Sequence, residues 1–147
     1  MSDDRARLVG MNHIALEVGD IDQALDFWGK IFRFELRSRT DTMAFIDMGD
    51  QFIALMQSDI PHRDEHRHFG LVVDDRSKVR ELARAAGAEV PESWALDIID
   101  PWGNFIQVLE YRDIQFSKTD PVKAGMGMAD LDKSERAIKE LAEKGMA

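Results

Sequence analysis

The sequence predicts an α+β fold in which two tandem βαβββ modules form a cup-shaped mixed sheet, followed by a C-terminal helix. Two internal matches support this prediction. Residues 12–20 return in similar form as residues 67–75, an offset of 55 (67 − 12). Residues 45–55 return as residues 98–108, an offset of 53 (98 − 45). A duplicated unit has a pseudo-twofold axis, at which equivalent residues of the two copies can face one shared site.

The first module opens with a strand and a helix. Alternation along the chain predicts a strand with His13, Ala15 and Glu17 on one face. Asp20 or Asp22 is expected to cap the amphipathic helix that follows, because apolar residues recur there at helical spacing. The module spans about residues 9–57, with elements expected over residues 11–18, 22–31, 34–38, 43–47 and 51–57.

The second module repeats this order after a polar connector. The connector, residues 58–67, contains Pro61, and we expect His62 and His66 to be solvated loop residues there. The module covers residues 68–111, with elements expected over residues 68–73, 77–86, 89–90, 95–99 and 105–111.

A C-terminal extension, residues 112–147, follows the duplicated part. Residues 118–127 carry Gly and Pro and are expected to form a loop. Residues 132–144 are expected to form a helix with Asp132 in its cap. Its apolar stripe must be buried on the body or on a second subunit, and consists of Ile138, Leu141 and Ala142. We expect a homodimer.

Composition narrows the class of protein. A length of 147 residues with 44% hydrophobic content fits a single domain, residues 1–147. The absence of cysteine excludes thiolate chemistry, disulfides and Cys-based zinc sites. A formal charge of −9 disfavours nucleic acid as a partner, because phosphate neutralisation needs clustered Lys and Arg. No apolar stretch approaches the ~18 residues of a membrane span, and the first residues lack the apolar segment of a secretion signal. We therefore expect a soluble, cytoplasmic protein with no membrane partner.

Three motifs together resemble a known family. They are Asn12-His-Ile-Ala-Leu with Val18-Gly-Asp20, Ala24-Leu-Asp-Phe-Trp28, and Asp100-Pro-Trp-Gly-Asn104. With the duplication, they resemble the vicinal oxygen chelate superfamily, which groups glyoxalase I, bleomycin- and fosfomycin-resistance proteins, extradiol dioxygenases and methylmalonyl-CoA epimerase. The resemblance covers roughly residues 10–111. Arg33 departs from the pattern, which usually has Gly there, and a left-handed Arg would be strained.

The resemblance implies a divalent metal ion inside the cup, held by the first and last strands of each module. The corresponding positions are His13, Ala54, His68 and Gln107. Ala54 offers no donor atom, and Gln107 offers only a neutral oxygen. An odd separation on a strand directs Glu110 to the face opposite Gln107, so it cannot substitute without a β-bulge. The predicted metal ligands are therefore His13, His68 and Gln107, with Zn, Fe, Ni or Mn as the ion. The alternative is that both histidines are pocket residues without an ion.

Three further residues complete the predicted site. Glu17 shares a face with His13, and is a candidate general base or the partner of a cationic ligand group; a solvated strand-end carboxylate is the alternative. An Arg at this position is common in glutathione-dependent glyoxalases, and a Glu there disfavours a glutathione adduct. Ala54 and Met56 are expected to line an apolar half of the substrate pocket.

Two functions follow from this resemblance, and both bind a small molecule in the central cup. The first is a metal-dependent lyase, isomerase or dioxygenase. The second is a metal-free binding protein that sequesters an apolar or cationic small molecule, as bleomycin-resistance proteins do.

Overall fold

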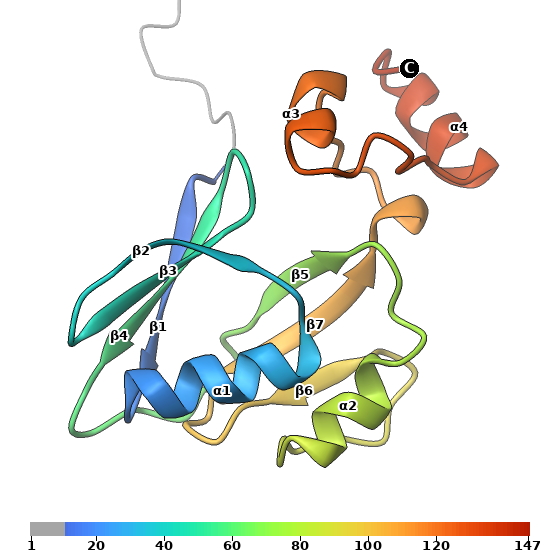
Figure 1. The fold of residues 1–147 in the computed structure, drawn as a ribbon. Coiled ribbons are helices and arrows are strands. Elements are labelled where there is room, and N and C mark those ends of the chain that lie inside the picture. Colours follow the sequence, from blue (N-terminus) through green and yellow to red (C-terminus); the bar gives the residue numbers. More distant parts are fainter. Residues whose placement is uncertain (1–10) are drawn as a thin grey trace, which may run out of the picture.

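The structure, a computed structural model, describes residues 11–147, so residues 9 and 10 of the predicted first module lie outside the described part. The first module forms a four-stranded sheet in the order β1-β4-β3-β2, in which β1 and β4 are parallel (Figure 1). Its elements are β1 (His13–Val18), α1 (Ile21–Ile31), β2 (Glu35–Arg39), β3 (Met43–Asp47) and β4 (Phe52–Gln57). The predicted βαβββ order is confirmed in this module.

The second module forms a three-stranded sheet in the order β5-β7-β6. Its elements are β5 (Phe69–Val73), α2 (Val79–Ala85), β6 (Asp97–Ile99) and β7 (Phe105–Glu110). The strand predicted at residues 89–90 is reduced to a single bridge between Glu89 and Ile99. Pro91 follows directly and has no N–H to continue a ladder. The α+β class is confirmed, but the described strands form two mixed sheets rather than one.

The helix α1 forms for the reasons the sequence suggests. The Asp20 side chain accepts a hydrogen bond from the backbone N–H of Gln23 at 2.8 Å, which confirms the first of the two predicted caps. Its buried residues are Ile21, Ala24, Phe27, Trp28 and Ile31, and Leu25 is partly buried against them. Every positive φ among the described residues belongs to a glycine, so the strain considered at Arg33 does not arise.

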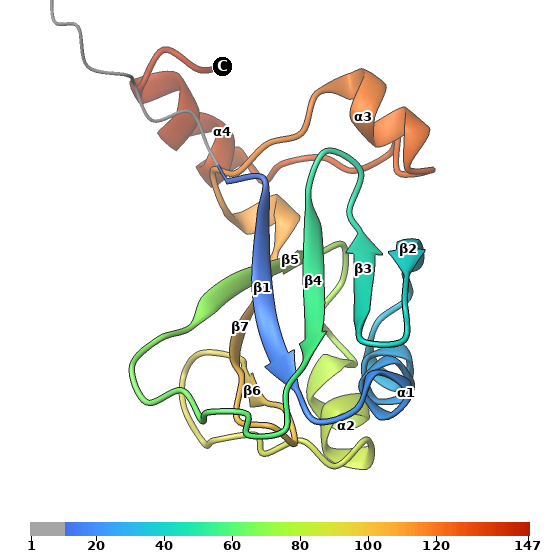
Figure 2. The same cartoon turned by 90° about the vertical axis from the view of Figure 1, so that its left-hand side faces the viewer.

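The two sheets share one core. Each sheet turns one face toward a core that it shares with α1 and α2, and these two helices lie side by side at the end of the molecule opposite the C-terminal extension (Figures 1 and 2). Leu16 and Leu55 contribute from the first sheet, and Ile106 and Val108 from the second. Because neighbouring strand residues alternate between faces, the residues on either side of these buried positions point away from the core.

The C-terminal extension is more helical than predicted. It contains a 3₁₀ turn (Tyr111–Asp113), α3 (Asp120–Gly125) and α4 (Glu135–Glu143). The loop expected over residues 118–127 is wrong, because Thr119 caps α3 and a Pro occupies its first turn, where a missing N–H costs nothing. These elements lie together at one end of the molecule (Figures 1 and 2).

Helix α4 also differs from its prediction in its cap and its buried face. Ser134, not Asp132, caps it by accepting from the backbone N–H of Ala137. Its buried residues are Ala137 and Leu141, whereas Ile138 is 47% exposed and Ala142 is exposed. The helix starts at Glu135, three residues later than predicted, and its buried face contains Ala137 and Leu141 rather than the whole expected stripe. Among the described residues, no helix is long and apolar enough to cross a membrane.

Candidate functional site

The predicted residues of the first module share one sheet face. In the parallel pairing of β1 with β4, His13 lies opposite Phe52, Ala15 opposite Ala54, and Glu17 opposite Met56. The His13 ring stacks on Phe52 with centroids 4.6 Å apart. Its Nδ1 lies 2.9 Å from Oδ1 of Asn12. This pair of contacts orients the imidazole at the start of β1.

The same face continues across β3 as an apolar surface. Phe45 pairs with Ala54 and lies beside Phe52, with ring centroids 5.2 Å apart. Met56 is 41% exposed. Figure 2 looks onto this sheet, and no helix of residues 11–147 lies in front of it. We call this surface the open face; it consists of His13, Ala15, Glu17, Phe45, Phe52, Ala54 and Met56.

A cation borders the open face. Arg37 places its guanidinium over the Phe52 ring, with Cζ 4.7 Å from the ring centroid. The same guanidinium donates to Asp47 at 2.9 Å and to the backbone oxygens of Gly49 and Gln51. These three acceptors hold the Arg37 guanidinium over the face of the Phe52 ring, which is the geometry of a cation–π contact.

The predicted residues of the second module lie on the other sheet. Gln107 pairs with Gly70 on β5, and the His68 ring lies against Phe105, two residues before Gln107, with centroids 6.0 Å apart. His68 and Gln107 therefore border one surface, which we call the second face: His68, Asp97, Phe105 and Gln107. Like the open face, it lies opposite the buried residues of its own sheet.

Asp97 is a member of this face that the sequence reasoning missed. It lies directly opposite Gln107 in the antiparallel pairing of β6 with β7. Directly paired residues of a ladder project from the same face, with Cβ atoms roughly 5 Å apart. The Ser93 hydroxyl donates to Asp97 Oδ2 at 3.5 Å. The β6–β7 hairpin is symmetric about Trp102 (97 + 107 = 99 + 105), so the position of Asp97 follows only once β6 is known to pair with β7.

Glu110 lies on the opposite face, as predicted. It pairs with Val73 in a ladder without a register shift, and its Oε1 accepts from the backbone N–H of Arg76 at 3.1 Å. It therefore holds the segment before α2, and the second face has Asp97 as its carboxylate.

The predicted site residues do not all line the same cavity. Glu17, Met56 and His68 line a cavity of about 400 Å³, whereas His13 lines a different cavity of about 650 Å³. Gln107 lines neither of them. Among the described residues, no group of three or more His, Cys, Asp or Glu side chains is placed to hold a metal ion. One chain thus brings His68 near Gln107, but it does not bring His13 to them.

The connector fixes Glu17 at the smaller cavity. Its Oε2 accepts from the backbone N–H of His62 at 3.2 Å. Asp64 of the connector accepts from the backbone N–H of Phe105 at 3.2 Å. His62 and His66 are exposed, as predicted. The connector therefore joins the end of β1 to the start of β7.

The Asp100-Pro-Trp-Gly-Asn104 turn ties the two modules together. Asp100 is 3% exposed and accepts from the backbone N–H groups of Trp102 and Asn104. The Asn104 amide donates to Asp100 at 2.7 Å and to the backbone oxygen of Glu17, also at 2.7 Å. Burial raises the pKa of Asp100, and these hydrogen bonds oppose the shift. The motif is structural, since it locks β1 beside the second module.

Comparison with known proteins agrees with this architecture. Residues 10–93 match the model of the Glyoxalase/Bleomycin resistance protein/Dioxygenase superfamily. A glutathione transferase, FosA of Serratia marcescens, is 22% identical over 113 residues, covering 69% of this chain and 80% of that protein.

Solved structures share the fold. The fosfomycin resistance protein FosX of Listeria monocytogenes, complexed with Mn(II) and sulfate, has a TM-score of 0.61 at 17% identity, covering 82% of this chain and 99% of that one. An integron cassette protein of V. cholerae has a TM-score of 0.55 at 21% identity, covering 73% of this chain and 98% of that one. The family match, the duplicated sheets and the motif residues agree, and the chain belongs to the Glyoxalase/Bleomycin resistance protein/Dioxygenase superfamily, the vicinal oxygen chelate superfamily that its sequence resembles.

Proposed function

We propose that the chain binds a small molecule between two copies, with the open face of one copy opposite the second face of the other. One observation carries this proposal: His13 lies on the first sheet and borders the larger cavity, whereas His68 borders the smaller cavity and shares a face of the second sheet with Gln107. A twofold axis would place each open face against a second face, so that one dimer holds two identical sites. The exposed Met56 and the partly exposed Phe45 and Phe52 of the open face give such a pairing its driving force.

A divalent metal ion is part of this proposal, and it depends on the dimer. Within one chain the donors do not fit an ion, because residues 11–147 place no group of three His, Asp or Glu side chains together, and the second face has one imidazole and one carboxylate beside the neutral Gln107 amide. His13 from the other copy would make a set of His13, His68, Asp97 and Gln107. Imidazoles with a carboxylate suit Mn, Fe, Ni or Zn, and the FosX structure similar to this chain contains Mn(II). A bound ion would polarise an oxygen atom of the small molecule.

Glu17 is the proposed acid–base group of this site. It lies on the open face, four residues after His13, and it borders the same cavity as His68. The N–H of His62 holds one carboxylate oxygen, which leaves the other available to accept a proton. Its proposed role is to move a proton on a ligand placed between the two faces.

The test mixes two inactive variants. His13→Ala and His68→Ala should each bind Mn²⁺ far more weakly than the wild type. After subunit exchange, half of the dimers combine one chain of each kind, and each of these holds one intact site. Mn²⁺ binding, followed by calorimetry and elemental analysis, should recover to about a quarter of the wild-type stoichiometry. Absence of any recovery, or full binding by His13→Ala alone, would contradict the proposal.

A metal-free binding protein is the second candidate, and one observation favours it. Ala54 is buried without a donor atom among Phe45, Phe52 and Met56, so half of the site is apolar. If the wild type binds no Mn²⁺ while an apolar or cationic compound raises its melting temperature, this function replaces the first.

A further inference from the structure

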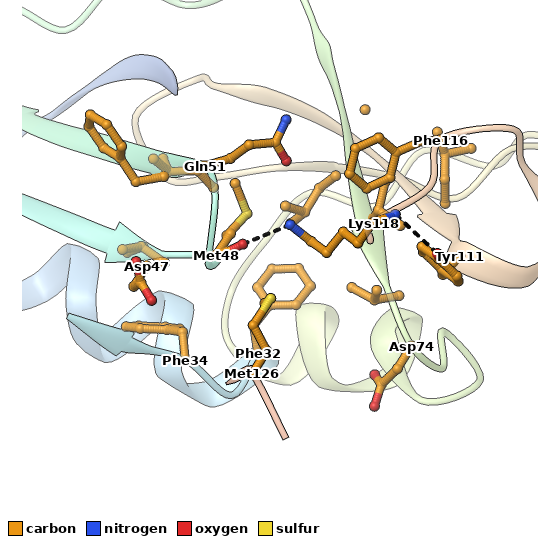
Figure 3. A pocket seen from close by; sticks show the side chains of 18 of the residues that line it. Phe32, Phe34, Asp47, Met48, Gln51, Asp74, Tyr111, Phe116, Lys118 and Met126 are labelled. Atoms are coloured by element: carbon orange, nitrogen blue, oxygen red, sulfur yellow. Dashed lines mark hydrogen bonds between the residues drawn. The ribbon is translucent and has the colours of Figure 1, made fainter. Parts of the chain in front are cut away.

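The larger cavity lies outside the proposed site apart from its contact with His13. It has a volume of about 650 Å³, within the range of small-molecule pockets. The inner faces of both sheets, the end of α1 and the C-terminal extension enclose it. Figure 3 shows side chains converging from these elements, among them Phe32, Met48, Phe116 and Met126. Its wall is largely apolar.

The C-terminal extension forms one side of this cavity and is held firmly. Lys133 donates to the backbone oxygens of Tyr111, Ile114 and Phe116, and its Nζ lies 3.6 Å from the centroid of the Tyr111 ring. Tyr111 in turn accepts from the backbone N–H of Lys118 at 3.1 Å. The family match ends at residue 93, so the extension is a feature beyond the matched segment.

Lys118 is the buried charged side chain of the cavity wall. Its side chain is 9% exposed, and its Nζ donates to the backbone oxygen of Met48 at 2.9 Å (Figure 3). The same nitrogen also donates to Asp50. The Phe116 ring centroid lies 5.6 Å from the same nitrogen. An ammonium has three N–H donors, so these two acceptors leave one donor for an occupant.

A second donor in the wall also lacks an acceptor. Trp28 lines the cavity, and its indole Nε1 is buried without a hydrogen-bond partner among the described residues. Leaving such a donor unpaired costs about 1–3 kcal/mol. The third N–H of Lys118 and the indole N–H of Trp28 are both donors, so an acceptor oxygen complements each of them.

The charge around the cavity disfavours an anion. The exposed lining residues include the carboxylates Asp74 and Asp75 and the cation Arg33. The Asp47 carboxylate also lines the cavity but is already paired with Arg37. Asp50 already neutralises the ammonium of Lys118. An uncharged oxygen can share the ammonium without repelling these carboxylates.

We propose that this cavity binds a neutral, largely apolar molecule bearing an acceptor oxygen, such as an aliphatic ketone or ester, with Lys118 as the hydrogen-bond donor. The binding site is separate from the one proposed between two copies, and it does not depend on a metal ion. The molecule fills the space between the sheets and the extension, and its oxygen lies at the Met48–Lys118 end.

The experiment titrates 2-nonanone, and in parallel the anion nonanoate, into the wild-type protein. Calorimetry measures affinity, and the methyl NMR signals of methionine give the location. Met126 and Met128 line the cavity, whereas Met56 lies on the open face. We expect the ketone to shift the signals of Met126 and Met128 but not that of Met56, and to bind at least tenfold more tightly than nonanoate.

Two substitutions and a control complete the test. Lys118→Met keeps the apolar stem of the side chain but removes the hydrogen-bond donor, and it should weaken the binding of the ketone roughly tenfold. Leu131→Trp should abolish binding by filling the cavity. Lys30→Met, on the exposed side of α1, should change nothing.

Several results would overturn the proposal: equal or tighter binding of nonanoate, an unchanged affinity in both cavity variants, or a shift of Met56 alone. Signals of Met126 and Met128 that move with protein concentration without ketone would overturn it too, because a second copy would then occupy the cavity. The His68→Ala variant should lose Mn²⁺ binding but should bind the ketone as tightly as the wild type. The two proposals can therefore be contradicted independently of each other.

Discussion

At the scale of single residues, Gln107 occupies the position at which the resemblance implies a metal-binding carboxylate, and the proposed site takes its carboxylate from Asp97 instead. Gln107 keeps the geometry of that position but not the charge, and Asp97 supplies a charge from the neighbouring strand. Sequence reasoning could place Gln107, because its distance from the turn motif is fixed. It could not place Asp97, since that required the pairing of β6 with β7 as well.

The Asp97→Asn variant tests this arrangement. It removes the negative charge of the second face while preserving the size of the side chain, so Mn²⁺ affinity should fall by roughly tenfold or more. Asp41→Asn, in the exposed turn before β3, is the matched control and should leave the affinity unchanged. Calorimetric titration of both variants measures the effect, and equal affinities would exclude Asp97 from the site.

Asp100 gives a prediction about pH. Because burial raises its pKa, the folded chain keeps this proton to a higher pH than the unfolded chain does. Its contribution to the free energy of unfolding is therefore largest at low pH, and it decreases as pH rises from the ordinary value of 3.8 through the raised one. Asp100→Asn lacks this dependence. Urea unfolding of both proteins between pH 4 and 7 should show the wild type losing stability relative to the variant, and a difference that stays constant would contradict this.

At the scale of elements, the sequence predicted periodic segments well and irregular ones poorly. The helix α1 has both a cap and an apolar stripe, and its prediction differs from the structure by one residue. The strand predicted at residues 89–90 is only a single bridge, because Pro91 cannot continue the ladder. The Pro and Gly of residues 118–127 favour a loop in the sequence, whereas in the structure Thr119 caps a helix there. In each case a local backbone requirement, rather than hydrophobic pattern, decided the outcome.

Helix α4 provides a prediction that separates the two possible caps. Ser134→Ala removes the acceptor for the N–H of Ala137 and should destabilise the helix by about 1 kcal/mol. Asp132→Ala should have little effect, because Asp132 lies outside the cap. Hydrogen exchange of the Leu141 amide measures the local free energy of opening. A larger loss in Asp132→Ala than in Ser134→Ala would show that Asp132 caps the helix, as the sequence predicts.

At the scale of the whole molecule, the shared core determines where the site can form. Both sheets turn their buried faces toward α1 and α2, so the faces that carry His13 and Gln107 point outward. The site that we propose combines the two faces from different copies.

The open face should therefore carry the dimer contact. Phe45→Glu places a charge at its centre and should weaken dimerisation by at least tenfold, because burying an unpaired carboxylate is costly. Leu82→Glu, on the partly exposed side of α2, is the control and should leave the dimer unchanged. Sedimentation across a range of concentrations measures both, and a dimer that persists in Phe45→Glu would place the contact elsewhere.

The sequence by itself determined the repeated module, the faces of β1 and β4, and the residues that correspond to the family's metal ligands. These follow from periodicities of two and 3.6 residues and from the offset between the copies, which are local properties of the chain. Only the tertiary structure decided how the two modules face each other, that Asp97 lies beside Gln107, and that the extension encloses a cavity with Lys118. Such contacts depend on which surfaces share a core, and that choice is made by packing between residues far apart in the sequence.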